Sequence, residues 1–213
     1  MRARPDLLTT LAVLTKRVTK LTEEDGLKLD RVIKYMGSTP ELSLNLGCIF
    51  PPRVTTWVDA AFGVHSDMKS HTGVCSTLGL GMWHSKSTTQ KLNTTSSTEA
   101  ELVGVSKGIR QSLWAANFLA LQGYPRQPVR IYQDNMSTIK LIEKGRSTSE
   151  LTRHIDLGFF WLHDLLKRGL ITVEYCPTEQ MVADFMTKPL QGSLFQTMRD
   201  KVMGATSCTV TDS

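Results

Sequence analysis

Four acidic residues lie in stretches whose other residues suit the interior of a folded protein. They are Asp59, Glu99, Asp134 and Asp184. An unpaired carboxylate is costly in such surroundings. Four carboxylates that converge over one sheet can instead hold divalent cations such as Mg²⁺, which make the clustered negative charge tolerable. Two cations about 4 Å apart can activate a water molecule and stabilise the leaving oxygen of an in-line displacement at phosphorus.

Asp59 and Asp134 both belong to predicted β-strand regions. Asp59 interrupts residues 54–62, a stretch suited to the centre of a sheet, and a strand-end or turn acid is the alternative to a metal ligand. Asp134 follows residues 129–133, at the carboxyl end of a predicted strand, where α/β proteins commonly place chemistry. The same position also suits the N-cap of the helix that follows. Both interpretations stay open for each residue taken alone.

Glu99 and Asp184 belong to predicted helices. Glu99 lies in the first turn of a helix predicted over residues 97–121, and we expect it to face the sheet while Glu101 points elsewhere. A capping or helix-dipole partner is the alternative for a glutamate at a helix start. Asp184 lies within an apolar helical turn at residues 181–186, where a carboxylate is harder to explain as a structural residue.

The elements that must position these acids mix helical and β-type patterns. Apolar residues recur at helical spacing in residues 5–20 and 22–36, and the double proline at 51–52 marks a boundary. Beyond it we predict strands at 54–62, 73–80, 81–87, 129–133 and 170–175, and helices at 97–121, 137–144, 155–167 and 179–202, the last broken at Pro189. This order predicts an α/β fold in which a mixed sheet, an antiparallel meander plus parallel strands, is flanked by helices.

Length and composition fit one domain with a small helical appendage. We assign residues 1–50 to the appendage, 51–204 to the main domain and 205–213 to a disordered tail. The net charge of +5 favours a polyanionic partner held by local patches. No apolar run is long enough to span a bilayer, and the four cysteines form no CxxC pair. An intracellular, reducing compartment without membrane contact is therefore expected.

Five stretches of the main domain carry a family resemblance. They are Trp57-Val58-Asp59-Ala60, Ser96-Ser97-Thr98-Glu99-Ala100-Glu101, Asp134-Asn135, Thr152-Arg153-His154-Ile155-Asp156 and Val182-Ala183-Asp184-Phe185-Met186-Thr187-Lys188-Pro189-Leu190. Together they resemble the ribonuclease H domain of copia-type retrotransposon polyproteins. The resemblance implies a ribonuclease H-like fold and an endonuclease that cuts the RNA strand of RNA–DNA hybrids with two Mg²⁺ ions, for which Mn²⁺ can substitute. It places the catalytic, metal-binding acids at Asp59, Glu99, Asp134 and Asp184.

The appendage carries a second resemblance. Residues 4–39 resemble the carboxyl-terminal, thumb-like part of the reverse transcriptase of the same elements, so the remainder of such an enzyme is an expected partner. The paired-aspartate motif of the polymerase, Tyr-x-Asp-Asp, occurs nowhere in this sequence. We therefore expect no polymerase activity from this chain alone. Because Met1 lies almost directly before Arg4-Pro5-Asp6, where the resemblance begins, we also expect a truncated reading frame. The resemblance implies a cytoplasmic location in virus-like particles for the parent element, with the nucleus as the alternative.

Substrate contacts are expected from small polar and basic side chains, because a hybrid is held through its phosphates and 2′-hydroxyls. The candidates are Ser97, Asn135, Arg146, Arg153 and His154. Ser97 ends a hydroxyl-rich run that also suits a helix N-cap, and Asn135 adjoins Asp134. The loop between residues 144 and 154 concentrates cations beside the expected site, although a solvated loop is the ordinary interpretation.

The sequence departs from the resemblance at one position. Many ribonucleases H carry a histidine a few residues before the last aspartate, whereas residues 175–180 contain none here. His154 is the candidate for an analogous role, and a structural hydrogen bond is the alternative.

Two rival functions remain open. A catalytically idle module would bind hybrid, or the rest of a polymerase through residues 1–50. A DNA strand transferase of the integrase type would use the same kind of sheet with fewer acids. The presence of four candidate acids favours the ribonuclease.

Overall fold

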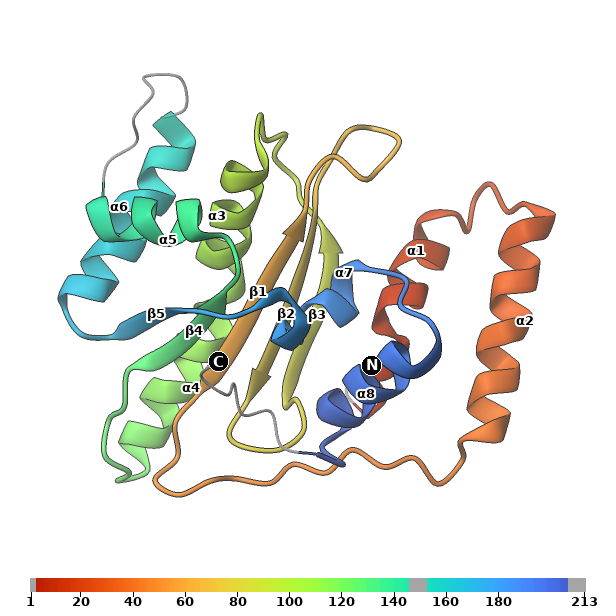
Figure 1. The fold of residues 1–213 in the computed structure, drawn as a ribbon, viewed down its shortest axis with the longest axis horizontal. Coiled ribbons are helices and arrows are strands. Elements are labelled where there is room, and N and C mark those ends of the chain that lie inside the picture. The colour runs from red at the N-terminus through yellow and green to blue at the C-terminus, as the bar shows by residue number, and fades with distance from the viewer. Residues whose placement is uncertain (1–2, 146–152, 207–213) are drawn as a thin grey trace.

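A five-stranded mixed sheet forms the centre of the molecule (Figure 1). The computed structural model describes residues 3–145 and 153–206, with side chains in the second range described for residues 158 and 160–206. The strands are β1 (Thr55–Ala61), β2 (His71–Thr77), β3 (His84–Thr89), β4 (Val129–Gln133) and β5 (Ile171–Tyr175). They lie in the order β3-β2-β1-β4-β5. The pairs β1–β2 and β2–β3 are antiparallel, and β1–β4 and β4–β5 are parallel. The predicted α/β fold with its mixed sheet is therefore confirmed.

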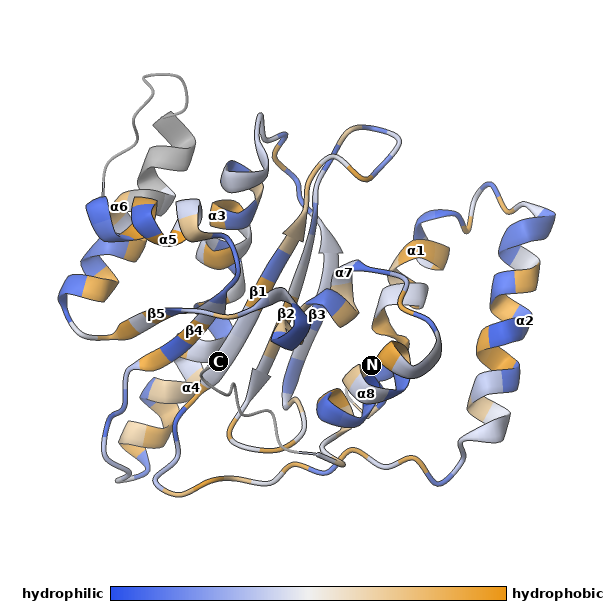
Figure 2. Cartoon of the chain, in the orientation of Figure 1, coloured by the Kyte–Doolittle hydropathy of each residue, from blue (hydrophilic) through white to orange (hydrophobic). Residues whose placement is uncertain are grey.

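Helices cover both faces of the sheet. The helices are α3 (Ser97–Gly108), α4 (Arg110–Leu121), α5 (Met136–Lys144), α6 (Arg153–Lys167), the short α7 (Asp184–Thr187) and α8 (Gly192–Met203). Side chains of β1 alternate between two cores, because successive residues of a strand point to opposite faces. Val58 belongs to a core with residues of α3 to α6, and Trp57 belongs to a second core with residues of α7 and α8. Hydrophobic residues accordingly occur in the sheet and in the helices on both sides of it (Figure 2).

The N-terminal segment packs against α7 and α8, on the face of the sheet that carries Trp57. It consists of a 3-10 turn at Pro5–Leu7, α1 (Leu8–Lys16) and α2 (Glu23–Ser38). Leu8 packs against the core that contains Trp57, and the Thr9 hydroxyl donates a hydrogen bond to the carbonyl of Phe185 at 2.5 Å. The outer helix α2 contacts α1 (Figure 1). It begins with a capping box formed by Thr22 and Asp25. The division of the chain near residues 51–52 stays a prediction.

Two predicted helices differ from the structure. The helix predicted over 97–121 is divided into α3 and α4 at Ile109, directly after Gly108, a residue that weakens helix interiors. The last helix is three pieces, a 3-10 turn at Thr178–Gln180, α7 and α8. Pro189 separates α7 from α8 because proline has no N–H and clashes with the preceding helical turn. Among the described residues, no helix is long and apolar enough to cross a membrane.

Candidate metal centre

The candidate site lies where two parallel strands separate. The β4 strand pairs with β1 only at Thr55, Thr56 and Trp57, whereas β1 continues to Ala61. Asp59 therefore lies beyond the last β1–β4 pair, and Asp134 follows the last residue of β4 directly. Two adjacent parallel strands thus bring one carboxylate each to the same end of the sheet, a position at which α/β proteins bind ligands.

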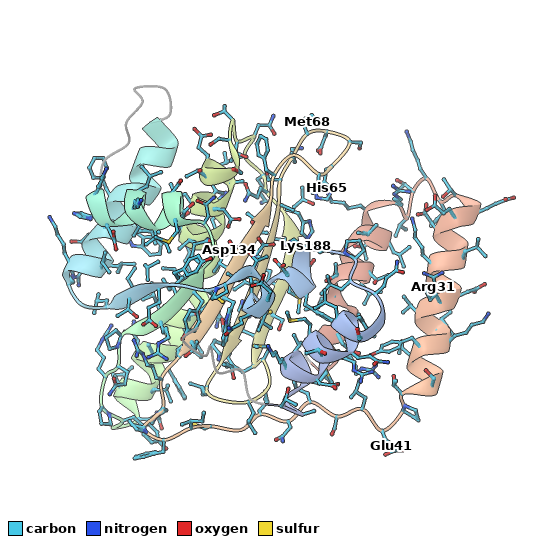
Figure 3. All side chains as sticks on the ribbon, in the orientation of Figure 1. Arg31, Glu41, His65, Met68, Asp134 and Lys188 are labelled. Carbon is cyan, nitrogen blue, oxygen red and sulfur yellow. The ribbon has the colours of Figure 1, made fainter. Side chains whose placement is uncertain are left out.

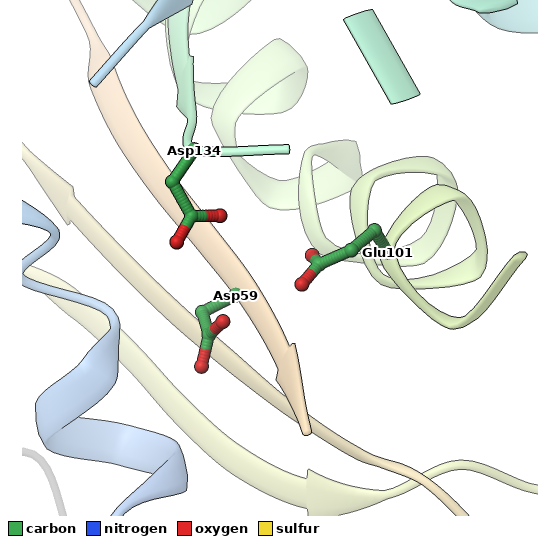
Figure 4. A group of neighbouring side chains, drawn as sticks. All are labelled: Asp59, Glu101 and Asp134. Atoms are coloured by element: carbon green, nitrogen blue, oxygen red, sulfur yellow. The ribbon is translucent and has the colours of Figure 1, made fainter. Parts of the chain in front are cut away.

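Glu101 supplies a third carboxylate from α3. Its Oε1 accepts a hydrogen bond from the backbone N–H of Ala60 at 3.1 Å, and its Oε2 accepts one from Nε2 of Gln133 at 3.1 Å. Glu101 thereby links β1 to the end of β4 where the two strands no longer pair. Asp59, Glu101 and Asp134 each contribute one carboxylate oxygen, and these three oxygens lie within 4.8 Å of one another. Figure 4 shows the three side chains.

Asp184 comes to the same place through α7. Gly73 is the register partner of Asp59, and a Cβ atom at Gly73 would lie 2.6 Å from the carbonyl oxygen of Ala183. The missing side chain lets α7 lie directly on β2. The hydroxyl of Thr187, at the end of α7, donates a hydrogen bond to Oδ2 of Asp59. The two ends of α7 therefore both face the carboxylate cluster.

Burial and mutual repulsion raise the pKa values of Glu101, Asp134 and Asp184. Burial, followed by the charge of Asp59, raises the pKa of Glu101 to about 9. Burial raises the pKa of Asp184 to about 6, with Asp59 and Asp134 adding to the rise while Lys188 opposes it. Burial and Asp59 also raise the pKa of Asp134. The protein alone therefore does not fully compensate this negative charge.

A lysine lies at the rim of the cluster. The Lys188 ammonium donates a hydrogen bond to Oδ2 of Asp184 at 2.6 Å. Asp134 and Lys188 both lie near the centre of the view in Figure 3. Burial lowers the pKa of Lys188, but the hydrogen bond and charge of Asp184, followed by the charges of Asp59 and Asp134, raise it above its usual value. The other oxygen of Asp184, Oδ1, is buried without a hydrogen-bond partner in the described structure.

These donors fit divalent metal ions. Mg²⁺ and Mn²⁺ prefer carboxylate oxygens, and the cluster offers three converging carboxylates with a fourth alongside. A buried carboxylate oxygen without a partner, as at Asp184, is costly unless a ligand satisfies it. A cation would remove both the repulsion and the missing interaction.

The expected orientations of Glu99 and Glu101 are wrong. Glu99 accepts hydrogen bonds from the N–H and the hydroxyl of Thr95, both at 2.7 Å, at the start of α3. This is the capping role that was the alternative for Glu99. Glu101 instead faces the sheet, because α3 packs on β1 and β2 through Gly104 and Gly108, which lie three and seven residues after Glu101.

The structure describes the side chains of two of the five predicted substrate residues, Ser97 and Asn135. Ser97 is exposed in the first turn of α3. Asn135 caps α5 by accepting hydrogen bonds from two backbone N–H groups, of Ser137 at 3.0 Å and of Thr138 at 3.1 Å, so Asn135 takes the N-cap role considered for Asp134. Arg146 lies outside the described residues. Arg153 and His154 open α6, but their side chains lie outside the described structure. Their roles in substrate binding stay predictions.

Three further side chains of the site escaped sequence analysis. Gln133 is fully buried and joins Glu101 to the backbone N–H of Asn135. Thr187 and Lys188 contact Asp59 and Asp184. The sequence signal for Glu101 was available, since Glu101, Gly104 and Gly108 share one helix face and two glycines on a helix face indicate close packing.

The fold and the site together define an α/β protein with a carboxylate cluster at the edge where parallel strands separate. Its homologues are retrovirus-related Pol polyproteins from plant and yeast transposons. This chain is 29% identical over 204 residues to the polyprotein from transposon RE1 of Arabidopsis thaliana. The match covers 93% of this chain and 14% of that protein. This chain is 25% identical over 200 residues to the one from transposon TNT 1-94 of Nicotiana tabacum, covering 93% and 15%. The chain thus spans about one seventh of the length of these relatives.

Solved structures give a weaker likeness. A ribonuclease H1 isolated from compost, LC11-RNase H1, has a TM-score of 0.48 and 13% identity, covering 63% of this chain and 92% of that chain. A foamy viral protease-reverse transcriptase in complex with dsDNA has a TM-score of 0.45 and 15% identity, covering 83% and 35%. No protein-family model matches the chain.

Proposed function

We propose that this chain is a metal-dependent endonuclease that cuts the RNA strand of RNA–DNA hybrids. The observation that carries the proposal is the convergence of Asp59, Glu101 and Asp134 within 4.8 Å, with Asp184 beside them. Homology to retrovirus-related Pol polyproteins of transposons, and the resemblance of residues 4–39 to part of a reverse transcriptase, support a substrate of this kind. A reverse transcriptase is the proposed partner, and the proposed compartment is intracellular.

The four carboxylates would hold two Mg²⁺ ions, for which Mn²⁺ can substitute. Glu101, in place of Glu99, would hold one cation together with Asp134, Asp184 would hold the second, and Asp59 would contribute to both. The bound cations would supply a reactive water molecule and stabilise charge on the leaving oxygen. The protein's own contribution is to hold the carboxylates in place: Gln133 and the Ala60 N–H orient Glu101, and Thr187 orients Asp59.

Substrate contacts are proposed for the five residues named in the sequence analysis. Ser97 is exposed at the start of α3 and is available to a sugar-phosphate backbone. Asn135 adjoins Asp134, and Arg146, Arg153 and His154 are the proposed phosphate contacts. These five positions form one proposal, that the hybrid lies across the ends of β1 and β4.

The test is cleavage of a 5′-labelled RNA annealed to DNA. The full chain and its Asp134→Asn variant are compared with Mg²⁺, with Mn²⁺ and with a chelator, and single-stranded RNA and duplex DNA serve as control substrates. The proposal expects cutting only of the hybrid, only with metal and only by the unmodified chain. Binding of the hybrid without cutting would favour the idle binding module, and cutting of duplex DNA ends alone would favour a strand transferase.

A further inference from the structure

Lys188 distinguishes Asp184 from the other three carboxylates. Within the part of the chain that the structure describes, Asp184 is the candidate ligand that forms an ion pair, with Lys188 at 2.6 Å. Asp59, Glu101 and Asp134 are held instead by uncharged donors, such as the Thr187 hydroxyl on Asp59. The side chain of Asp184 is 10% exposed and that of Lys188 is 44% exposed, so Lys188 reaches Asp184 from the solvent side.

Three hydrogen bonds hold the backbone of α7 and Lys188 in place. The Thr9 hydroxyl donates to the carbonyl of Phe185 at 2.5 Å, and the Ser87 hydroxyl donates to the carbonyl of Met186 at 2.7 Å. The N–H of Lys188 donates to the carbonyl of Asp184 at 2.9 Å. The ammonium, by contrast, is at the end of a flexible, half-exposed stem and can leave Asp184 without movement of the backbone.

We propose that Lys188 is an internal counter-ion that competes with a divalent cation for Asp184. An ammonium ion and a metal cation use the same carboxylate lone pairs and repel each other at short range. Lys188 therefore makes the Asp184 side of the cluster bind a cation more weakly than the side formed by Asp59, Glu101 and Asp134. The inference rests on the proposed metal centre, and it assigns Lys188 a positioning role rather than a catalytic one.

The experiment measures cation binding to the full chain, without substrate. Calorimetric titration with Mg²⁺, or titration with Mn²⁺ followed by electron paramagnetic resonance, resolves a tighter and a weaker binding step. In Lys188→Gln the weaker step is expected to tighten by about three- to fivefold, because a partly exposed ion pair contributes at most about a factor of five. The tighter step is expected to stay within about twofold.

Matched variants isolate the charge at this position. Lys34→Gln removes the same charge from an exposed position on α2 and is expected to leave both steps unchanged. Lys188→Arg keeps the charge and is expected to bind cations as the unmodified chain does. In an Asp184→Asn background, Lys188→Gln is expected to have no effect, because the carboxylate for which the two cations compete is gone.

The outcomes separate this inference from the proposed function. A weaker step that is unchanged or weakened in folded Lys188→Gln overturns the inference, and so does equal tightening in the Asp184→Asn background. Lys188→Met, a side chain of similar length, replaces the glutamine variant if circular dichroism shows that the latter does not fold. Failure to cut hybrid with the Lys188 effect intact overturns the proposed function alone. Absence of cation binding by the unmodified chain overturns both.

Discussion

Glu101 links the metal centre to the architecture of the sheet. One carboxylate oxygen accepts from the backbone of β1 and the other from Gln133 at the end of β4, so the side chain bridges the two strands where they separate. Substituting Glu101 therefore affects both the charge of the cluster and the spacing of its strands. Gln133 has no charge of its own, but it fixes which way Glu101 faces.

The two glutamates of α3 can be separated by matched substitutions. Glu101→Gln is expected to lower hybrid cleavage by at least about 100-fold, because loss of a ligand costs at least as much as loss of its supporting group. Glu99→Gln is expected to lower it by less than about fivefold, since Glu99 bonds to Thr95 at the helix start. Initial rates on labelled hybrid at saturating Mg²⁺ provide the measurement.

The opposite pattern of rates would contradict the assignment of Glu101 as a ligand. Strong loss in Glu99→Gln with near-normal rates in Glu101→Gln would restore Glu99 as the ligand and show that α3 rotates when metal binds. Melting curves of both variants ensure that each is compared in its folded form.

Sequence analysis located the acidic regions better than the exact residue. Asp59, Asp134 and Asp184 stood out because each interrupts or directly follows an apolar element, and the structure gathers all three. Glu99 and Glu101 are two residues apart in one helix start, and the choice between them depended on which helix face meets the sheet. That face is decided by contacts of Gly104 and Gly108 with β1 and β2, which are distant in sequence.

At the level of elements, α7 has an importance that its length conceals. It has four residues, too few to be stable as an isolated helix. Contacts with β2, β3 and α1 hold it in place, with Gly73 at the closest approach. The position of Asp184 therefore depends on packing rather than on helix propensity.

Gly73→Ala tests this dependence. The added Cβ would lie 2.6 Å from the Ala183 carbonyl and 2.8 Å from Cβ of Met186, so α7 must move away from β2. We expect a loss of about 1–3 kcal/mol in the free energy of unfolding, as for other overpacked sites, and a lower cleavage rate. Urea unfolding followed by circular dichroism gives the first value.

Gly26→Ala is the control for that substitution. Gly26 lies within α2, and a Cβ there would meet nothing within 4 Å. It is expected to be neutral or to stabilise the protein by up to about 1 kcal/mol, because alanine favours helices over glycine. Equal stability of Gly73→Ala and the unmodified chain would show that α7 does not rest on β2.

The sequence predicted the order of elements and placed most of them to within a few residues, because apolar periodicity and glycine or proline breaks are local signals. All five strands were located, and β4 matched the prediction over Val129–Gln133. The division of the last helix was only partly predicted. Met181 and Val182, between the 3-10 turn and α7, are fully buried in the core around Trp57. Their burial is a tertiary contact, so local sequence patterns do not reveal that it interrupts the helix.

At the level of the whole molecule, the buried carboxylates predict how stability depends on pH in the absence of metal. The folded-state pKa of Glu101 is raised from 4.5 to about 9, so between these values the folded protein retains a proton that the unfolded chain loses. Stability is therefore expected to fall as pH rises from 7 to 9, by up to about 1.4 kcal/mol per pH unit. His71, whose pKa burial lowers to about 4, has the opposite effect only below about pH 6.5.

Thermal melting at pH 7, 8 and 9 in the presence of a chelator measures this dependence. Glu101→Gln cannot ionise and is expected to remove most of the decrease. Saturating Mg²⁺ is expected to raise the melting temperature most at pH 9, because a bound cation favours the ionised carboxylates. A melting temperature that stays constant from pH 7 to 9 without metal would show that Glu101 is ionised or solvated throughout this range.

The contact of α1 with α7 also has a consequence for synthesis of the protein on the ribosome. Thr9 and Phe185 are 176 residues apart in sequence, and Asp184 is the last of the four acids to be made. The nascent chain therefore exposes the apolar face of α1, and lacks a complete carboxylate cluster, until α7 and α8 have emerged. Pairing of such distant segments is slow, so the cation-binding site is expected to form only after α7 and α8 have been made.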